Sequence, residues 1–236
     1  MRLLLFSNST NAGEKYLEYT KNYIREFLGI NPYKLVFIPF AGVTISGKNY
    51  TARVKEVFSS IGYSIQSVED YSEYTKAIES AEGIVVGGGN TFQLLKKLQT
   101  YNLLEPIRKK VLAGTSYIGW SAGSNLACPT IKTTNDMPIV EPAGFKALNL
   151  FPFQINSHYT DKNPEGHAGE TREMRIEEFI EVNPDVYVVG LREGTLLKVE
   201  NENLHLLGDK PARIFKKQQS PVELTSSENF RFLLKK

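Results

Sequence analysis

Residues 116–124 read Ser116-Tyr-Ile-Gly-Trp-Ser121-Ala-Gly-Ser124 and contain the pattern G-x-S-x-G. The first five residues are β-prone, and the serine follows them directly. In this pattern the serine lies on a sharp, strained turn between a strand and a helix, where the crowded backbone requires small neighbours. The turn exposes the hydroxyl and aims the following N–H groups at the atom that it attacks. We therefore expect Ser121 to be a nucleophile.

The residues before this turn alternate between short apolar runs and segments with apolar residues at helical spacing. The pattern predicts strands at residues 3–7, 34–39, 64–68, 83–86 and 116–120, and helices at 14–28, 49–60, 73–80, 91–99 and 104–112. This alternation predicts an α/β fold, a mostly parallel sheet with helices on both faces. In such sheets sites form at the carboxyl ends of the strands, where Ser121 and the loop 87–90 both fall.

After Cys128 the pattern becomes irregular, and shorter strands follow. A strand-like run at 151–156 leads to His158, and a helix is expected at about 172–181. Further strands are expected at residues 186–190, 195–200, 203–206, 212–216 and 230–234. They predict a β-rich C-terminal part that extends the same sheet in antiparallel fashion. No repeat or linker divides the chain, so residues 1–236 are expected to form one domain.

The overall composition excludes several classes of protein. The 236 residues are 41% hydrophobic and 23% charged with a formal net charge of +2, which is typical of a globular chain. No basic run is long enough to indicate a nucleic-acid or membrane partner. Cys128 is the only cysteine, so no disulfide framework or cysteine metal cluster is expected. The apolar N-terminal run ends at Ser7, too short for a signal peptide, so we expect a cytoplasmic protein.

A serine nucleophile needs a base that accepts its proton and an acid that orients the base. Of the three histidines, His158 closes an apolar strand, His167 lies in a polar loop and His205 lies in a hairpin-like segment. The position at a strand end favours His158 as the base.

Two carboxylates compete for the role of the acid. Asp136 precedes the histidine, and this order, Ser–Asp–His, is that of α/β-hydrolases. Glu193 follows it and gives the order nucleophile–His–Glu of glutaminase-type amidotransferases. Glu193 comes after an expected strand and beside a glycine, which favours it, while Asp136 stays an alternative as a triad member, a helix cap or a substrate contact.

The loop Gly87-Gly88-Gly89-Asn90 also has two interpretations. A phosphate cradle is disfavoured because the G-x-G-x-x-G spacing is missing and no Lys-Ser/Thr follows. As an oxyanion hole, the glycines let backbone N–H groups approach a tetrahedral intermediate, and we prefer this hypothesis.

Five blocks of the sequence together resemble the peptidase E family, serine dipeptidases specific for an N-terminal aspartate. The blocks are Gly87–Leu95, Gly119–Asn125, Thr134–Pro138, Asn156–Tyr159 and Gly169–Ile176. The resemblance covers nearly the whole chain. It implies a flavodoxin-like fold related to class I glutamine amidotransferases, and hydrolysis of Asp-Xaa dipeptides through an aspartyl-enzyme ester, with no metal and no cofactor.

The resemblance also implies roles for individual residues. Ser121 would be the nucleophile and His158 the base, with either Asp136 or Glu193 as the acid. The oxyanion hole would be formed at Gly88, Gly89 and Ala122. Arg172 and Arg175 are candidates for binding the aspartyl side chain, since a guanidinium binds a carboxylate bidentately. Asn90, Gln93 and Asp136 are candidates for contacting the termini of the substrate.

Two other functions are weighed against this one. One is a cyanophycinase-like hydrolysis of β-aspartyl-arginine links, and the other is a non-catalytic small-molecule-binding protein on the same scaffold. The presence of serine, histidine and acid disfavours the second. The expected partner is a small-molecule substrate, and the expected state is a monomer or a homodimer.

Overall fold

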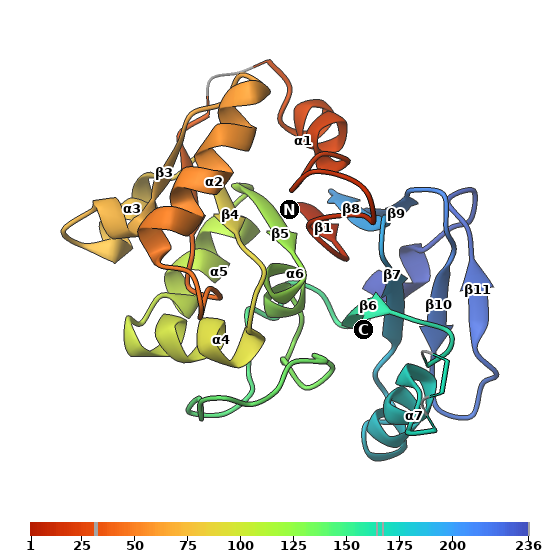
Figure 1. The fold of residues 1–236 in the computed structure, drawn as a ribbon. Coiled ribbons are helices and arrows are strands. Elements are labelled where there is room, and N and C mark those ends of the chain that lie inside the picture. Colours follow the sequence, from red (N-terminus) through yellow and green to blue (C-terminus); the bar gives the residue numbers. More distant parts are fainter. Residues whose placement is uncertain (31–32, 164, 167, 236) are drawn as a thin grey trace.

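The computed structural model describes residues 1–30, 33–163, 165–166 and 168–235, so His167 lies outside the described residues. The larger of the two sheets has seven strands. Figure 1 shows how this sheet lies among its helices. In spatial order the strands are β3 (Ile65–Ser67), β2 (Leu35–Ile38), β4 (Gly83–Val86), β5 (Ser116–Trp120), β1 (Arg2–Phe6), β8 (Leu196–Glu200) and β9 (Asn203–Leu207). The first five are parallel to one another. β8 runs antiparallel to β1, and β9 runs antiparallel to β8.

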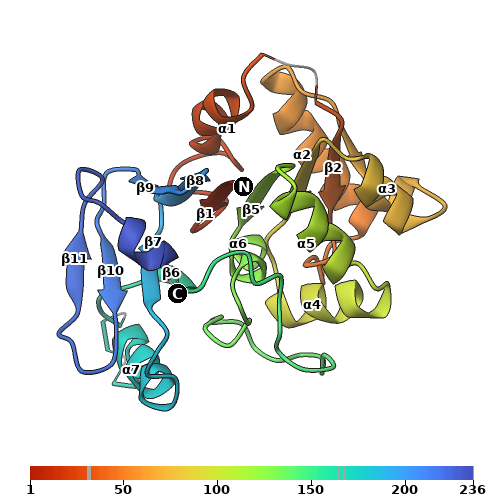
Figure 2. The same ribbon diagram turned by 180° about the vertical axis from the view of Figure 1, so that it is seen from behind.

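Helices cover both faces of this sheet, because the strand side chains alternate between two buried clusters. In β1, Leu4 and Phe6 pack with the apolar faces of α1 (Thr20–Leu28) and α2 (Gly47–Ser60). Leu3 and Leu5 belong to the cluster on the other face. That cluster is covered by α3 (Tyr74–Ser80), α4 (Thr91–Thr100), α5 (Leu104–Leu112) and α6 (Ala122–Ala127), as Figure 2 shows from behind. The predicted mostly parallel α/β architecture is confirmed.

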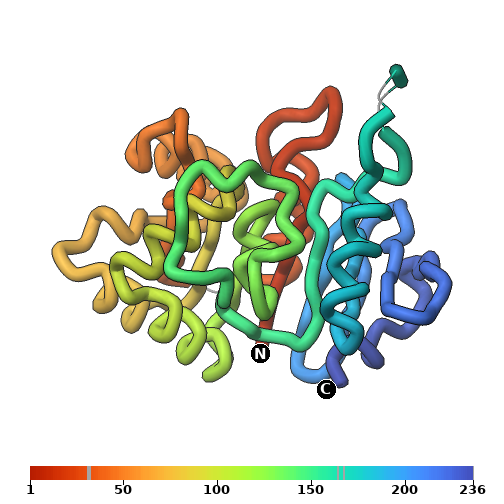
Figure 3. The backbone as a smooth tube through the Cα atoms, turned by 90° about the horizontal axis from the view of Figure 1, so that it is seen from below, coloured from red at the N-terminus to blue at the C-terminus, as the bar shows by residue number. Residues whose placement is uncertain are grey.

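The second sheet contains four strands from the C-terminal half of the chain. Their order is β11 (Val222–Leu224), β10 (Ala212–Phe215), β7 (Val188–Arg192) and β6 (Gln154–Tyr159), and α7 (Arg172–Val182) packs on β10. The irregular segment between α6 and β6, green in Figure 3, joins the two sheets. One buried cluster contains side chains from both sheets, among them Leu5, Ile155 and Val189.

The expectation that the whole β-rich tail extends one sheet is therefore wrong in part. Only β8 and β9 extend the parallel sheet, because β8 pairs with β1 after the turn that follows β7. β10 then returns to β7 and builds the second sheet. A sequence pattern predicts that a segment forms a strand, but it does not say which strand of the sheet this segment pairs with.

Two local predictions also need correction. The segment 230–234, predicted as a strand, forms a short 3₁₀ helix, η2 (Arg231–Leu234), which buries Phe230 and Leu233 three residues apart on one side. The helix predicted from residue 14 begins only at Thr20, since Leu17 adopts a positive φ of 56° that a right-handed helix excludes.

A further 3₁₀ turn, η1 (Val68–Asp70), follows β3. No helix among the described residues has the length and apolar composition needed to cross a membrane.

Candidate active site

The turn between β5 and α6 has the strained geometry that the sequence predicted. Ser121 has φ 53° and ψ −113°, outside the regions that most residues occupy. A Cβ on Gly123 would lie 2.2 Å from the carbonyl oxygen of Val86, and one on Gly119 would lie 2.6 Å from that of Gly123. Both glycines are required because neighbouring backbone lies where a side chain would begin. The turn is therefore packed against β4 and presents the Ser121 side chain at the strand end.

A β-bulge places His158 opposite Ser121. β6 and β7 pair in parallel, but Ser157 lies opposite Leu191 and Tyr159 lies opposite Arg192, so His158 is an extra residue in the ladder. Its φ is 56°, and such a bulge re-aims a side chain. The His158 Nε2 atom lies 2.8 Å from the Ser121 Oγ atom. His158 thus comes from the second sheet and Ser121 from the first.

Glu193, directly after β7, reaches the other ring nitrogen of His158. Its Oε1 atom lies 2.7 Å from His158 Nδ1. Asp136 lies at the beginning of α4, where its Oδ2 atom accepts hydrogen bonds from the Thr91 N–H at 2.7 Å and from the Thr134 hydroxyl at 3.0 Å. The structure therefore brings Ser121, His158 and Glu193 into one hydrogen-bonded series, while Asp136 caps a helix nearby.

Two residues that sequence reasoning passed over, Ser7 and Asn8, hold this series in place. The buried Ser7 hydroxyl accepts the His158 N–H at 2.9 Å and donates to the Leu191 carbonyl at 2.6 Å. Asn8 Oδ1 accepts the N–H of Gly194 at 2.9 Å, beside Glu193. Their place directly after β1, at the edge shared by the carboxyl ends of the parallel strands, is the signal that could have found them.

The loop after β4 lies against Ser121. A Cβ on Gly88 would lie 3.0 Å from the Cβ of Ser121. Gly89 has a φ of +134°, and a side chain there would meet the Ala41 carbonyl oxygen at 2.2 Å. In the part of the chain that the structure describes, the N–H groups of Gly88 and Gly89 have no backbone acceptor. Ala122, the first residue of α6, also has no partner within its helix for its N–H.

A cavity of about 620 Å³, large enough for a small ligand, is lined by Ser121, His158 and the glycine loop at Gly88 and Gly89. Of the described residues that line it, only Arg53 carries a fixed positive charge, and its guanidinium lies 3.9 Å from the centre of the Tyr16 ring. Asp136 and Asn90 line the same cavity. Asn90 caps α4 by accepting the Gln93 N–H at 3.0 Å.

The other polar candidates lie outside this lining. Gln93 is on α4 but does not line the cavity. Arg175 forms an ion pair with Glu170, at 3.4 Å between Nε and Oε2. Arg172 is close enough to interact electrostatically with Asp136, although burial and the neighbouring Arg175 lower its pKa. Among the residues with a described position, no three His, Cys, Asp or Glu side chains are grouped as metal ligands.

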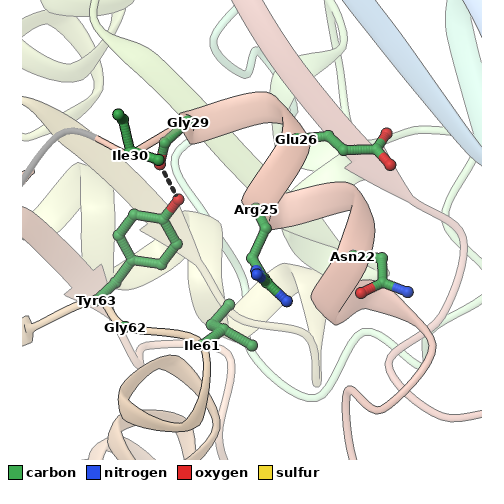
Figure 4. A pocket seen from close by; sticks show the side chains of 8 residues that line it. All are labelled: Asn22, Arg25, Glu26, Gly29, Ile30, Ile61, Gly62 and Tyr63. Atoms are coloured by element: carbon green, nitrogen blue, oxygen red, sulfur yellow. Dashed lines mark hydrogen bonds between the residues drawn. The ribbon is translucent and has the colours of Figure 1, made fainter.

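A second cavity of about 620 Å³ lies between the C-terminal ends of α1 and α2 (Figure 4). It is lined by Asn22, Arg25, Glu26, Gly29, Ile30, Ile61, Gly62 and Tyr63. None of the residues singled out from the sequence lines this second cavity.

Known proteins resemble this chain over nearly its whole length. Residues 3–207 match peptidase family S51. The chain is 52% identical over 235 residues to the peptidase E of Nostoc sp. (strain PCC 7120 / SAG 25.82 / UTEX 2576). This match covers 100% of this chain and 97% of that protein. It is 50% identical over 230 residues to the peptidase E of Escherichia coli O6:K15:H31 (strain 536 / UPEC), and this match covers 98% of this chain and 100% of that protein.

Solved structures share the fold at lower identity. A peptidase from an acI-B1 Actinobacterium has a TM-score of 0.68 at 17% identity, covering 97% of this chain and 96% of that one. A candidate peptidase E protein from Listeria monocytogenes EGD-e has a TM-score of 0.65 at 23% identity, and the match covers 89% of this chain and 98% of that one. The predicted resemblance to the peptidase E family is confirmed: the chain belongs to peptidase family S51 and is a serine-type peptidase.

Proposed function

We propose that this peptidase is a dipeptidase that hydrolyses Asp-Xaa dipeptides without a metal or a cofactor. The observation that carries the proposal is the series Ser121–His158–Glu193, with contacts of 2.8 and 2.7 Å, beside glycine N–H groups and a cavity of about 620 Å³. A nucleophile, an oriented base and oxyanion donors around one cavity are the parts that acyl transfer requires. The relatives named peptidase E support the same conclusion.

The geometry suggests how the reaction proceeds. Ser121 Oγ attacks the peptide carbonyl carbon while His158 Nε2 takes its proton, and Glu193 accepts the Nδ1–H and stabilises the imidazolium. The N–H groups of Gly89 and Ala122 hold the oxyanion, with the Gly88 backbone beside them. His158 then gives the proton to the leaving amino group. Water, activated by the same histidine, hydrolyses the aspartyl ester and restores the serine.

An Asp-Xaa dipeptide carries two carboxylates and one ammonium group, and the surroundings of the cavity offer partners of opposite charge. We assign the aspartyl side chain to Arg172, within electrostatic range of Asp136, and the C-terminal carboxylate to Arg53, which lines the cavity. The Oδ1 atom of Asp136 accepts no hydrogen bond from the described residues, so it can receive the ammonium group. Asn90 lies beside it, and Arg175 and Gln93 remain further candidates for substrate contacts.

The test is hydrolysis of Asp-Leu, Glu-Leu, Ala-Leu and β-Asp-Arg by the wild type and by Ser121→Ala. We expect turnover of Asp-Leu alone and a loss of about a thousandfold or more in the variant. Activity that survives in Ser121→Ala would refute the mechanism. Turnover of β-Asp-Arg in place of Asp-Leu would show a cyanophycinase-like enzyme, and ligand binding without any turnover would show a binding protein.

We also place the enzyme in the cytoplasm, where a lone buried thiol such as Cys128 stays reduced.

A further inference from the structure

The peptide between Gly88 and Gly89 is held from outside the loop by one side chain. Tyr50, in the second turn of α2, donates its hydroxyl hydrogen to the Gly88 carbonyl oxygen at 2.9 Å. The tyrosine is 6% exposed, and its ring packs edge-on against Phe37 with 5.1 Å between the ring centres. Burial also raises the pKa of Tyr50, so the hydroxyl keeps the proton that it donates.

The same hydroxyl is connected to the nucleophile. It accepts the indole N–H of Trp120 at 3.2 Å and lies 3.3 Å from the hydroxyl of Tyr16. A hydroxyl has one hydrogen and two lone pairs, so these three contacts satisfy it fully. Because Trp120 directly precedes Ser121, one atom fixes both the loop and the residue next to the serine.

The orientation of the peptide decides where its N–H points. In a planar trans peptide the C=O and the N–H point in opposite directions, so holding the Gly88 carbonyl at Tyr50 also fixes the direction of the Gly89 N–H. A peptide between two glycines has little conformational preference of its own. Without the bond to Tyr50, it is free to rotate and turn its carbonyl, rather than its N–H, toward Ser121.

We propose that Tyr50 is a positioning residue that keeps the Gly88–Gly89 peptide in the orientation required of an oxyanion hole. The inference deepens the proposed function and rests on the assignment of Gly89 as an oxyanion donor. It predicts a defect in the transition state only, since the hydroxyl is already occupied by three partners in the free enzyme.

The test compares Tyr50→Phe with a matched control, Tyr63→Phe. The Tyr63 hydroxyl also donates to a glycine carbonyl, that of Gly29, and the side chain is 7% exposed, but it lies at the second cavity (Figure 4). Loss of one oxyanion donor lowers kcat by about 100- to 1,000-fold, so a misoriented donor in Tyr50→Phe should lower kcat by about 10- to 100-fold. The KM for Asp-Leu should change less than about twofold. Tyr63→Phe should keep both constants.

A second readout does not depend on the substrate. A fluorophosphonate reacts when Ser121 Oγ bonds to phosphorus and fluoride leaves, with the serine proton passing to His158, and the phosphoryl oxygen occupies the oxyanion site. Labelling of Tyr50→Phe should slow by a similar factor, while Tyr63→Phe is labelled at the wild-type rate. Equal labelling of both variants would overturn the inference, as would a loss of thermal stability with kcat unchanged. Failure of Asp-Leu hydrolysis by the wild type would refute the proposed substrate and leave this labelling test valid.

Discussion

The contact between His158 and Glu193 supports a quantitative prediction about catalysis. Glu193→Ala removes the carboxylate that lies 2.7 Å from Nδ1, and Glu193→Gln replaces it with an amide of the same size. The amide can donate a hydrogen to Nδ1, which favours the tautomer that cannot accept the serine proton. We therefore expect Glu193→Gln to lower kcat at least as much as Glu193→Ala.

The expected magnitude follows from the exposure of the pair. Two unit charges about 4 Å apart attract by about 4 kcal/mol near a protein surface and by about 1 kcal/mol in water. The side chains of His158 and Glu193 are 40% and 49% exposed, so the stabilisation of the imidazolium lies between these limits. Since about 1.4 kcal/mol is a factor of ten in rate, Glu193→Ala should lower kcat about 5- to 1,000-fold.

Steady-state kinetics on Asp-Leu measure this effect, with Asp136→Asn as the control. Asparagine keeps an oxygen that can accept the Thr91 N–H, so the fold of the loop is preserved while the charge is lost. We expect this variant to raise KM through the lost contact with the substrate ammonium, with a smaller change in kcat. If Asp136→Asn instead lost turnover at unchanged KM while Glu193→Ala retained it, the assignment of the acid would be wrong.

Three further predictions concern other parts of the molecule. Ser7→Ala should lower kcat about tenfold at nearly constant KM, because the backbone N–H of the base loses its buried acceptor, and steady-state kinetics check this. Arg53→Gln should raise the KM for Asp-Leu but not for Asp-leucinamide, which lacks the C-terminal carboxylate; equal effects on both would refute the role of Arg53. Arg192 holds the pKa values of Asp161 and Glu223 below their usual range. The free energy of unfolding should therefore fall as pH drops through these lowered values, and urea titrations should show a smaller fall in Arg192→Met.

Local patterns explain how much of the fold could be predicted from the sequence. Alternating apolar runs and helical spacing up to Ser121 predict a parallel sheet with covered faces, because these patterns depend only on side-chain periodicity. The ends of elements were less predictable, as η2 shows, where apolar residues three apart form a helical turn instead of a strand. The pairing of β8 with β1 depends on an edge far away in sequence.

The pattern G-x-S-x-G was enough to predict the strained turn at Ser121, since the crowding that requires glycine at 119 comes from the backbone of Gly123, only four residues further on. The crowding at Gly123 comes from Val86 on the neighbouring strand and is visible only in the fold. The sequence also identified His158 and two possible acids. The choice of Glu193 over Asp136 as the partner of His158 required the folded structure, because β7 runs parallel to β6 and ends next to the bulge. Ser7, Tyr50 and Arg53 reach the site from other strands and helices, so no short sequence pattern contains them. Their positions follow from the packing of distant elements, which a linear pattern does not encode.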